Sequence, residues 1–162
     1  MPVFYGTFES GLDTKRRVSI PAPFRNRIES DPESGREKMI ALFASPEPEY
    51  PAIFGCTFSL LAVLPKVQAQ LAHESVEIRK AASKILRSII EHRIDDTGRI
   101  VLSAKLAEEF DLKKKVYFHG QGQFFEIWPI EDVDDYFEAE EASRVRRVLM
   151  MMTEEASAAG VL

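Results

Sequence analysis

One phrase occurs twice in the sequence, 82 residues apart. Residues 13–21 read DTKRRVSIP and residues 95–103 read DDTGRIVLS. Each phrase places an arginine, Arg17 or Arg99, four residues after an aspartate. In this register apolar residues also face apolar residues: Phe8 and Ile90, Leu12 and Ile94, Val18 and Ile100, Ile20 and Leu102, Phe24 and Leu106. Because chance rarely sustains such a register, the pattern indicates an internal duplication.

Each copy predicts the same order of elements. A strand-like run, at 3–9 or about 88–94, leads into a turn opened by the aspartate, whose short side chain can accept a hydrogen bond from the backbone two residues on. Gly98 suits the positive φ of the second turn, whereas Arg16 stands at the equivalent place in the first, where such a backbone is costly. An alternating strand, a short helix and a two-stranded ribbon follow. The predicted helices are 22–28 and 104–110, and the predicted ribbons pair 38–43 with 57–63 and 116–120 with 124–128.

The remaining segments are predicted to be helices and loops. Helices at 66–72 and 75–86 connect the copies, and repeat symmetry ends the second near residues 86–87 although its apolar stripe continues. A long helix covers 130–155 and is followed by a frayed tail, 156–162. The loop 31–38 and the Pro-rich stretch 45–51 are expected to be exposed insertions. We therefore divide the chain into a first repeat (3–64), connecting helices (65–86), a second repeat (87–130) and a C-terminal helix with its tail (131–162).

Length and composition fit a water-soluble protein. A chain of 162 residues can bury one sizeable core or two small ones that share an interface. No apolar run approaches the roughly 20 residues that cross a bilayer, and the N-terminus lacks the pattern of a secretory signal. The single cysteine, Cys56, is expected to be a buried small hydrophobe in a reducing compartment. We expect a cytoplasmic protein with no membrane partner.

Charge is unevenly distributed along the chain. The formal net charge of −5 does not by itself indicate a polyanionic partner. Residues 12–27 nevertheless contain five basic side chains against Asp13 alone, while residues 131–141 contain acids and no base. The basic group is a candidate binding surface, and the acidic run is expected to be a solvated helix face.

Catalytic and metal sites are not predicted. His73, His92 and His119 have no ligand spacing to one another or to Cys56. The serines at 19 and 103 have no histidine at an equivalent place, and the GQG segment at 120–122 lacks the strand-to-helix context of a phosphate loop. We therefore expect no enzyme activity, no metal, no cofactor and no small-molecule substrate.

The repeated phrase resembles a known family. Asp-x-x-Gly-Arg followed by an apolar strand resembles the swapped-hairpin motif of the AbrB superfamily, and two copies closed by GQFFEIWP (122–129) resemble the MraZ family of bacterial transcriptional regulators. The resemblance implies an α+β fold: a duplicated βαββ swapped-hairpin, AbrB-like double-split β-barrel with flanking helices. It also implies a ring-shaped homo-oligomer, associated with the nucleoid, that binds short direct repeats of double-stranded DNA in the promoter of the cell division and cell wall gene cluster. The sequence departs from the family pattern at Arg16, where glycine is usual, and at Ser103, where proline is usual.

The candidate DNA-binding residues are Lys15, Arg16, Arg17 and Arg99. A guanidinium just after a tight turn can reach phosphates or the O6/N7 edge of guanine. The alternative for Arg17 and Arg99 is an internal ion pair with the aspartate of the same turn; with the family resemblance, we favour DNA contact for Arg17. Lys15 and Arg16 are expected to contact phosphates, the alternative being a solvated basic turn.

Asp13, Asp95 and Gly98 are expected to shape the turns, because a carboxylate near DNA repels phosphate. The run Lys113–Lys115 follows a helix end and is interpreted as a solvated cap. Three functions remain: a DNA-binding regulator that controls its own promoter, an antitoxin-like or scaffold module of the same fold that binds a protein, and a structural oligomer without a ligand.

Overall fold

Strands from both halves of the chain share one sheet. The computed structural model describes residues 3–46, 50–136 and 140–160. Its larger sheet is antiparallel and six-stranded, in the order β1 (Thr7–Gly11), β7 (Lys115–Gly120), β8 (Phe125–Trp128), β4 (Ile53–Cys56), β3 (Met39–Ala44) and β5 (Ile90–Arg93). The N-terminal strand β1 thus pairs with β7, and β5 pairs with β3, so that each half supplies the edge strand of the other half's hairpin.

The strand pairing leaves the large sheet open. Its two ends are β1 and β5, and the pairings recorded for the described residues do not close it into a barrel. The expected double-split barrel is therefore not confirmed; the fold is a mixed α/β arrangement around an open antiparallel sheet.

A second, two-stranded sheet joins the repeated phrases. Its strands are β2 (Arg17–Ser19) and β6 (Arg99–Val101), paired antiparallel with Val18 opposite Ile100. Both of these central side chains are 1% exposed, because they face the core. Each strand is extended by a matching hydrogen bond, from the Ile20 amide to the Gly98 carbonyl (3.0 Å) and from the Leu102 amide to the Arg16 carbonyl (2.7 Å).

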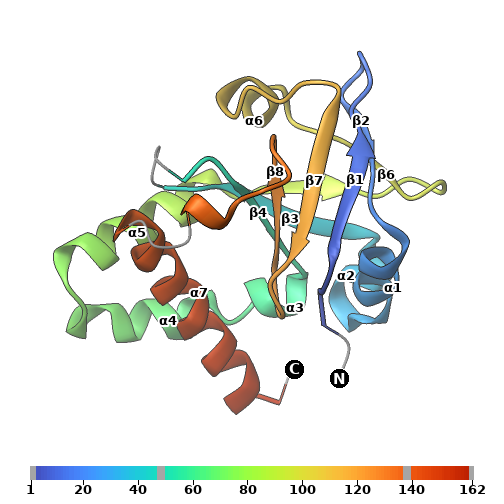
Figure 1. Ribbon diagram of the computed structural model, residues 1–162. Coiled ribbons are helices and arrows are strands. Elements are labelled where there is room, and N and C mark those ends of the chain that lie inside the picture. The colour runs from blue at the N-terminus through green and yellow to red at the C-terminus, as the bar shows by residue number, and fades with distance from the viewer. Residues whose placement is uncertain (1–2, 47–49, 137–139, 161–162) are drawn as a thin grey trace.

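Helices cover both faces of the large sheet (Figure 1). On one side lie α1 (Ala22–Ser30) and α2 (Pro32–Glu37), with α6 (Ala104–Glu109) at the end where the short sheet begins. On the other side lie α4 (Leu64–Gln70), α5 (Val76–Ser88) and α7 (Glu140–Ala158), with α3 (Phe58–Leu61) following β4. Two short 3₁₀ turns, Leu71–His73 and Asp134–Tyr136, complete the described elements.

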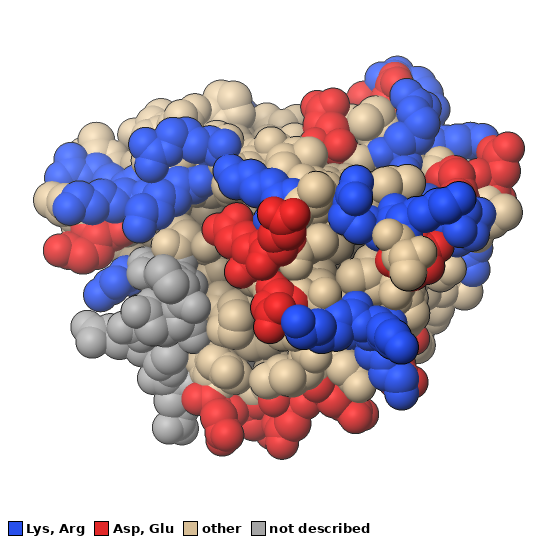
Figure 2. Space-filling model, turned by 90° about the horizontal axis from the view of Figure 1, so that it is seen from above, with Lys and Arg blue, Asp and Glu red and all other residues tan. Residues whose placement is uncertain are grey.

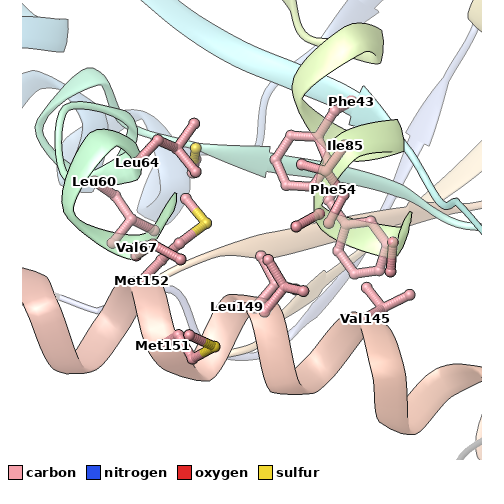
Figure 3. Packing of buried hydrophobic residues seen from close by; sticks show 14 of the residues in the cluster. Phe43, Phe54, Leu60, Leu64, Val67, Ile85, Val145, Leu149, Met151 and Met152 are labelled. Carbon is pink, nitrogen blue, oxygen red and sulfur yellow. The ribbon is translucent and has the colours of Figure 1, made fainter. Parts of the chain in front are cut away.

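The sheet separates two hydrophobic clusters. Alternate residues of β3 show the division, since Ile40 and Leu42 belong to one cluster and Ala41 and Phe43 to the other. The first contains Phe24 of α1 and residues of the β2–β6 ribbon; the second lies between the sheet and the helices α3, α4, α5 and α7. Figure 3 shows this second cluster, in which the apolar face of α7 points towards α3 and α4 and towards Phe43 and Phe54 of the sheet.

Two predicted segments of the first repeat are wrong. The loop expected at 31–38 contains α2, whose N-terminus is capped by the Asp31 carboxylate accepting from the Ser34 amide (3.0 Å), with Pro32 in the first turn. The strand expected at 57–63 lies earlier in the chain, at Ile53–Cys56. The helix α3 follows it, because the Thr57 hydroxyl caps this helix by accepting from the Leu60 amide (3.4 Å). In both segments a capping residue, Asp31 or Thr57, begins a helix that was not predicted.

The later segments also shift. The helix α5 continues to Ser88, and β5 begins at Ile90, two residues beyond the predicted break. The long helix predicted over 130–155 is replaced by a 3₁₀ turn at Asp134–Tyr136 and by α7 from Glu140, while residues 137–139 lie outside the described part. The predicted frayed tail starts too early, because Ala156 is fully buried within α7.

The Pro-rich stretch 45–51 is not simply an exposed insertion. Tyr50 is 2% exposed and donates a hydrogen bond to the buried Glu126 carboxylate (2.9 Å), which also accepts from the Trp128 indole nitrogen (2.8 Å). Burial raises the pKa of Glu126. Residues 47–49 of the predicted insertion lie outside the described part of the chain. Cys56 is buried as expected, and burial raises the pKa of its thiol to about 12.

Candidate nucleic-acid interface

The first turn is held by the carboxylate of Asp13. Its Oδ1 accepts hydrogen bonds from the amides of Lys15 (2.9 Å) and Arg17 (2.8 Å), and its Oδ2 lies 2.6 Å from the Nε of Arg17. The backbone closes the turn, with the Arg16 amide donating to the Asp13 carbonyl (3.0 Å). These bonds, led by the one from the Arg17 amide, lower the pKa of Asp13. The carboxylate thus stays ionised and fixes where Arg17 leaves the turn.

The second turn repeats this arrangement with an added hydroxyl. Asp95 Oδ1 accepts from the amides of Thr97 (2.8 Å) and Arg99 (3.0 Å) and from the Thr97 hydroxyl (2.7 Å). The Nε of Arg99 donates to the Thr97 hydroxyl (2.9 Å) and lies 3.5 Å from Asp95 Oδ2. The pKa of Asp95 falls to about 2, chiefly through the bond from the Arg99 amide.

Both turns pass through the left-handed backbone region at the same place. Gly98 has φ 81° and Arg16 has φ 61°. A side chain at Gly98 would overlap the Arg25 side chain. The left-handed backbone costs a non-glycine residue roughly 1–2 kcal/mol. At Arg16 this cost is partly offset by a hydrogen bond from Nε to the Leu102 carbonyl (3.0 Å), which directs the side chain back over the second half of the chain.

The two arginines meet on the outer face of the β2–β6 ribbon. Strand pairing sets Ser19 opposite Arg99 and Arg17 opposite Val101, so these four side chains share the face opposite the buried Val18–Ile100 pair. Arg17, Ser19 and Arg99 line one open depression of about 300 Å³ together with Asp13. The side chains of Arg17 and Arg99 are 39% and 36% exposed, so each is available to a ligand while it faces its own aspartate.

Comparisons with known proteins place the chain in a family. The family model for the MraZ protein, whose description adds the label antitoxin-like, matches residues 85–150. The transcriptional regulator MraZ of Gluconacetobacter diazotrophicus is 34% identical over 128 residues, covering 79% of this chain and 79% of the relative. That of Hyphomonas neptunium is 32% identical over 126 residues, covering 78% and 72%. The chain belongs to the MraZ family. The regulator MraZ of Ruegeria sp. is 30% identical over 146 residues, covering 85% of this chain and 83% of the relative.

The residue before the short helix differs between the two copies. Ser103 stands where the first copy has Pro21 and therefore adds a backbone amide, which donates to Nε2 of His92 at 3.2 Å. The other ring nitrogen, Nδ1, lies 3.0 Å from the Ile90 carbonyl, to which it donates. His92 is 5% exposed, and burial lowers its pKa, so the ring is held in its neutral form. At the equivalent position of the first copy Pro21 has no amide to satisfy.

Two basic groups lie beside the turns at places that the sequence did not predict. Arg25 of α1 packs against Gly98 of the second turn. The run Lys113–Lys115 lies beside the first turn, because the Leu12 amide donates to the Lys114 carbonyl at 2.8 Å. Both contacts join distant parts of the chain, so only the register of β1 against β7, and of β2 against β6, could have revealed them.

The surface charge is divided into patches. Figure 2 shows lysine and arginine side chains in several separate groups, with acidic side chains between them. Lys15 is exposed at the first turn. On the face seen in Figure 2, the basic side chains do not merge into one continuous basic surface.

None of the described helices has both the length and the apolar character needed to span a membrane.

Proposed function

We propose that this chain is a DNA-binding transcriptional regulator that contacts DNA through the outer face of the β2–β6 ribbon. The observation that carries the proposal is that Arg17 and Arg99, from copies 82 residues apart, line one open depression on that face. A two-stranded antiparallel ribbon is narrow enough to enter the major groove, where arginine binds O6 and N7 of guanine in a bidentate manner. The family supports the same function.

The ion pairs within the turns do not compete with this role. A guanidinium has five donors, and the bond recorded between Asp13 and Arg17 uses only Nε–H. The terminal NH₂ groups remain for a phosphate or a guanine edge. The two interpretations of Arg17, ion pair and DNA contact, are therefore compatible: the aspartate orients the arginine, and the DNA takes its outer edge. Lys15 and Arg16 supply phosphate contacts around it.

The finer features follow the family expectation. The chain is a duplicated AbrB-like hairpin unit, with the boundaries given above, and the antiparallel pairing of β1 with β7 and β5 with β3 supports an exchange of strands between the copies. It assembles into a ring-shaped homo-oligomer, associates with the nucleoid, and binds direct repeats in the promoter of its own gene cluster.

Binding to the DNA upstream of the protein's own gene tests this function. Fluorescence anisotropy with a labelled duplex of that region should give saturable binding by the wild type. The double variant Arg17→Ala/Arg99→Ala should bind at least ten-fold more weakly, because both guanidiniums leave the depression. Arg79→Ala, which removes an exposed arginine of α5, is the matched control and should bind like the wild type.

A protein-binding module of the same fold is the second candidate, favoured by the antitoxin-like description of the family model. The same titration separates the two functions. A wild type that binds neither the upstream duplex nor an unrelated duplex at low salt would reject the DNA-binding function and leave the protein-binding one.

A further inference from the structure

Each turn borders a depression, and the two depressions are equivalent in the backbone. Beside the first turn, the Leu12 amide donates to the Lys114 carbonyl at 2.8 Å; beside the second, the Ile94 amide donates to the Lys38 carbonyl at 2.8 Å. Lys114 and Lys38 thus hold corresponding places at the start of β7 and β3. Figure 1 shows the first of these junctions, where the link from α6 to β7 runs next to the loop that precedes β2.

The two depressions differ in size and in the residues at two equivalent positions. Beside the second turn the long side chain of Arg25 lies under Gly98, and about 200 Å³ remain. Beside the first turn Ala107 takes the place of Arg25 in the register of the repeat, Arg16 takes the place of Gly98, and the depression measures about 680 Å³. The first depression is therefore wide enough for a large ligand to approach its floor.

The two depressions also differ in charge. The first is lined by Arg16, Lys113, Lys114 and Lys115 against Asp13. The second is lined by Arg25 and Lys38 against three acids, Glu29, Asp95 and Asp96. The same backbone frame thus presents an excess of positive charge at one turn and an excess of negative charge at the other.

Lys114, like Arg16, is a cation of the first depression with no ion pair recorded among the described residues, and Arg16 already donates its Nε–H to the Leu102 carbonyl. Lys113 lies 2.7 Å from Asp111 and Lys115 lies 3.0 Å from Glu9, both as exposed ion pairs. The structure records no ion pair for the exposed Lys114 side chain within the part of the chain that it describes. Exposed ion pairs contribute little to stability, so a phosphate can also displace the partner of Lys113.

We propose that this depression binds phosphate groups of the same DNA duplex that the ribbon contacts, with Lys114 as the principal contact and Lys113 as the second. The proposal rests on the proposed function and adds a contact supplied by the second half of the chain to the turn of the first. The backbone bond from the Leu12 amide to the Lys114 carbonyl fixes the point from which the lysine side chain extends, next to the turn that carries Arg17. Phosphate contacts position a protein without reading sequence, and these would set the ribbon in register on the duplex.

A salt series with two lysine variants tests the proposal. Lys114→Gln should reduce the slope of log affinity against log salt by about 0.9 for each phosphate that is no longer neutralised. Because phosphates carry no sequence information, the loss should be the same for the upstream duplex and for a scrambled duplex. Lys38→Gln changes the corresponding lysine of the second depression and should leave both the slope and the affinity as in the wild type.

The outcomes separate this inference from the proposed function. A salt slope for Lys114→Gln equal to that of the wild type, while Arg17→Ala/Arg99→Ala weakens binding, would overturn the inference and leave the function standing. Equal slope reductions in Lys114→Gln and Lys38→Gln would overturn the claimed asymmetry. Absence of DNA binding by the wild type would overturn both. Equal thermal midpoints of the two lysine variants and the wild type exclude unfolding as the cause of a lost contact.

Discussion

The turns at 13–17 and 95–99 have the same hydrogen bonds and different surroundings. In both, an aspartate Oδ1 accepts from the amides two and four residues on, and the residue before the arginine is left-handed. Around this common frame the first turn has Arg16 and three lysines, whereas the second has Gly98, Arg25 and three acids. Very few residues are therefore enough to keep the backbone of these two turns the same while the charge around them differs.

A substitution at the left-handed position of the second turn should have the largest effect on stability. Gly98→Ala should lower the free energy of unfolding by about 2–3 kcal/mol, because a Cβ there adds backbone strain and must also displace the flexible side chain of Arg25. Chemical denaturation with urea measures this loss. The double variant Gly98→Ala/Arg25→Ala should recover the part due to the clash. A Gly98→Ala protein as stable as the wild type would show that the two turns do not depend on the left-handed backbone in the way described.

Loss of the hydrogen bond between the Ser103 amide and His92, at the start of α6, should lower the stability by a smaller amount. His92→Leu should cost about 1–3 kcal/mol of unfolding free energy, because the Ser103 amide loses its acceptor. The double variant His92→Leu/Ser103→Pro should recover most of this, since it removes the donor as Pro21 does in the first copy, and φ at Ser103 is −52°. Urea denaturation at pH 7.5 measures both. A double variant no more stable than His92→Leu would contradict the pairing.

The same histidine predicts a pH dependence. Burial lowers the pKa of His92 in the folded protein below its usual value of 6.5, so the folded state binds this proton less readily than the unfolded state. Its contribution is fully present above pH 6.5 and is lost as the pH falls towards the folded pKa. The stability difference between wild type and His92→Leu should therefore shrink between pH 7.5 and pH 5. A constant difference would mean that His92 does not titrate in this environment.

The effect of Arg16→Gly should be the smallest. Relief of the left-handed strain and loss of the bond from Arg16 Nε to the Leu102 carbonyl oppose each other, so the unfolding free energy should change by no more than about 1 kcal/mol. DNA binding should become less salt-dependent, since one cation leaves the first turn. A large loss of stability would show that Arg16 holds the two copies together.

Local features of the fold were predictable from the sequence. The two turns and the helices after them follow from short signals, an aspartate at the start of each turn and Pro21 or Ser103 before each helix. The helix α2 was missed although Asp31 and Pro32 are a capping signal, because the segment is only six residues long and contains Gly35. The end of β4 was missed because the apolar run 57–63 fits a strand or a helix equally well.

The candidate site was predictable only in part. Lys15, Arg16, Arg17 and Arg99 stand in the repeated phrase itself, and their role in DNA binding stays a prediction. Nothing local in the sequence places Lys114 next to Leu12 or Arg25 next to Gly98, because these contacts depend on how strands about a hundred residues apart pair. The internal duplication and the domain boundaries likewise remain predictions.

The most direct test of the account compares Arg17→Ala with Arg99→Ala. Fluorescence anisotropy with the labelled upstream duplex, across a salt series, measures the loss of affinity for each variant. Because the first turn has an excess of cations and the second an excess of acids, Arg17→Ala should lose at least ten times more affinity than Arg99→Ala, with the assembled mass and the thermal midpoint unchanged. Equal losses for the two variants would contradict the division of roles between the turns, and undiminished binding by both would contradict the site itself.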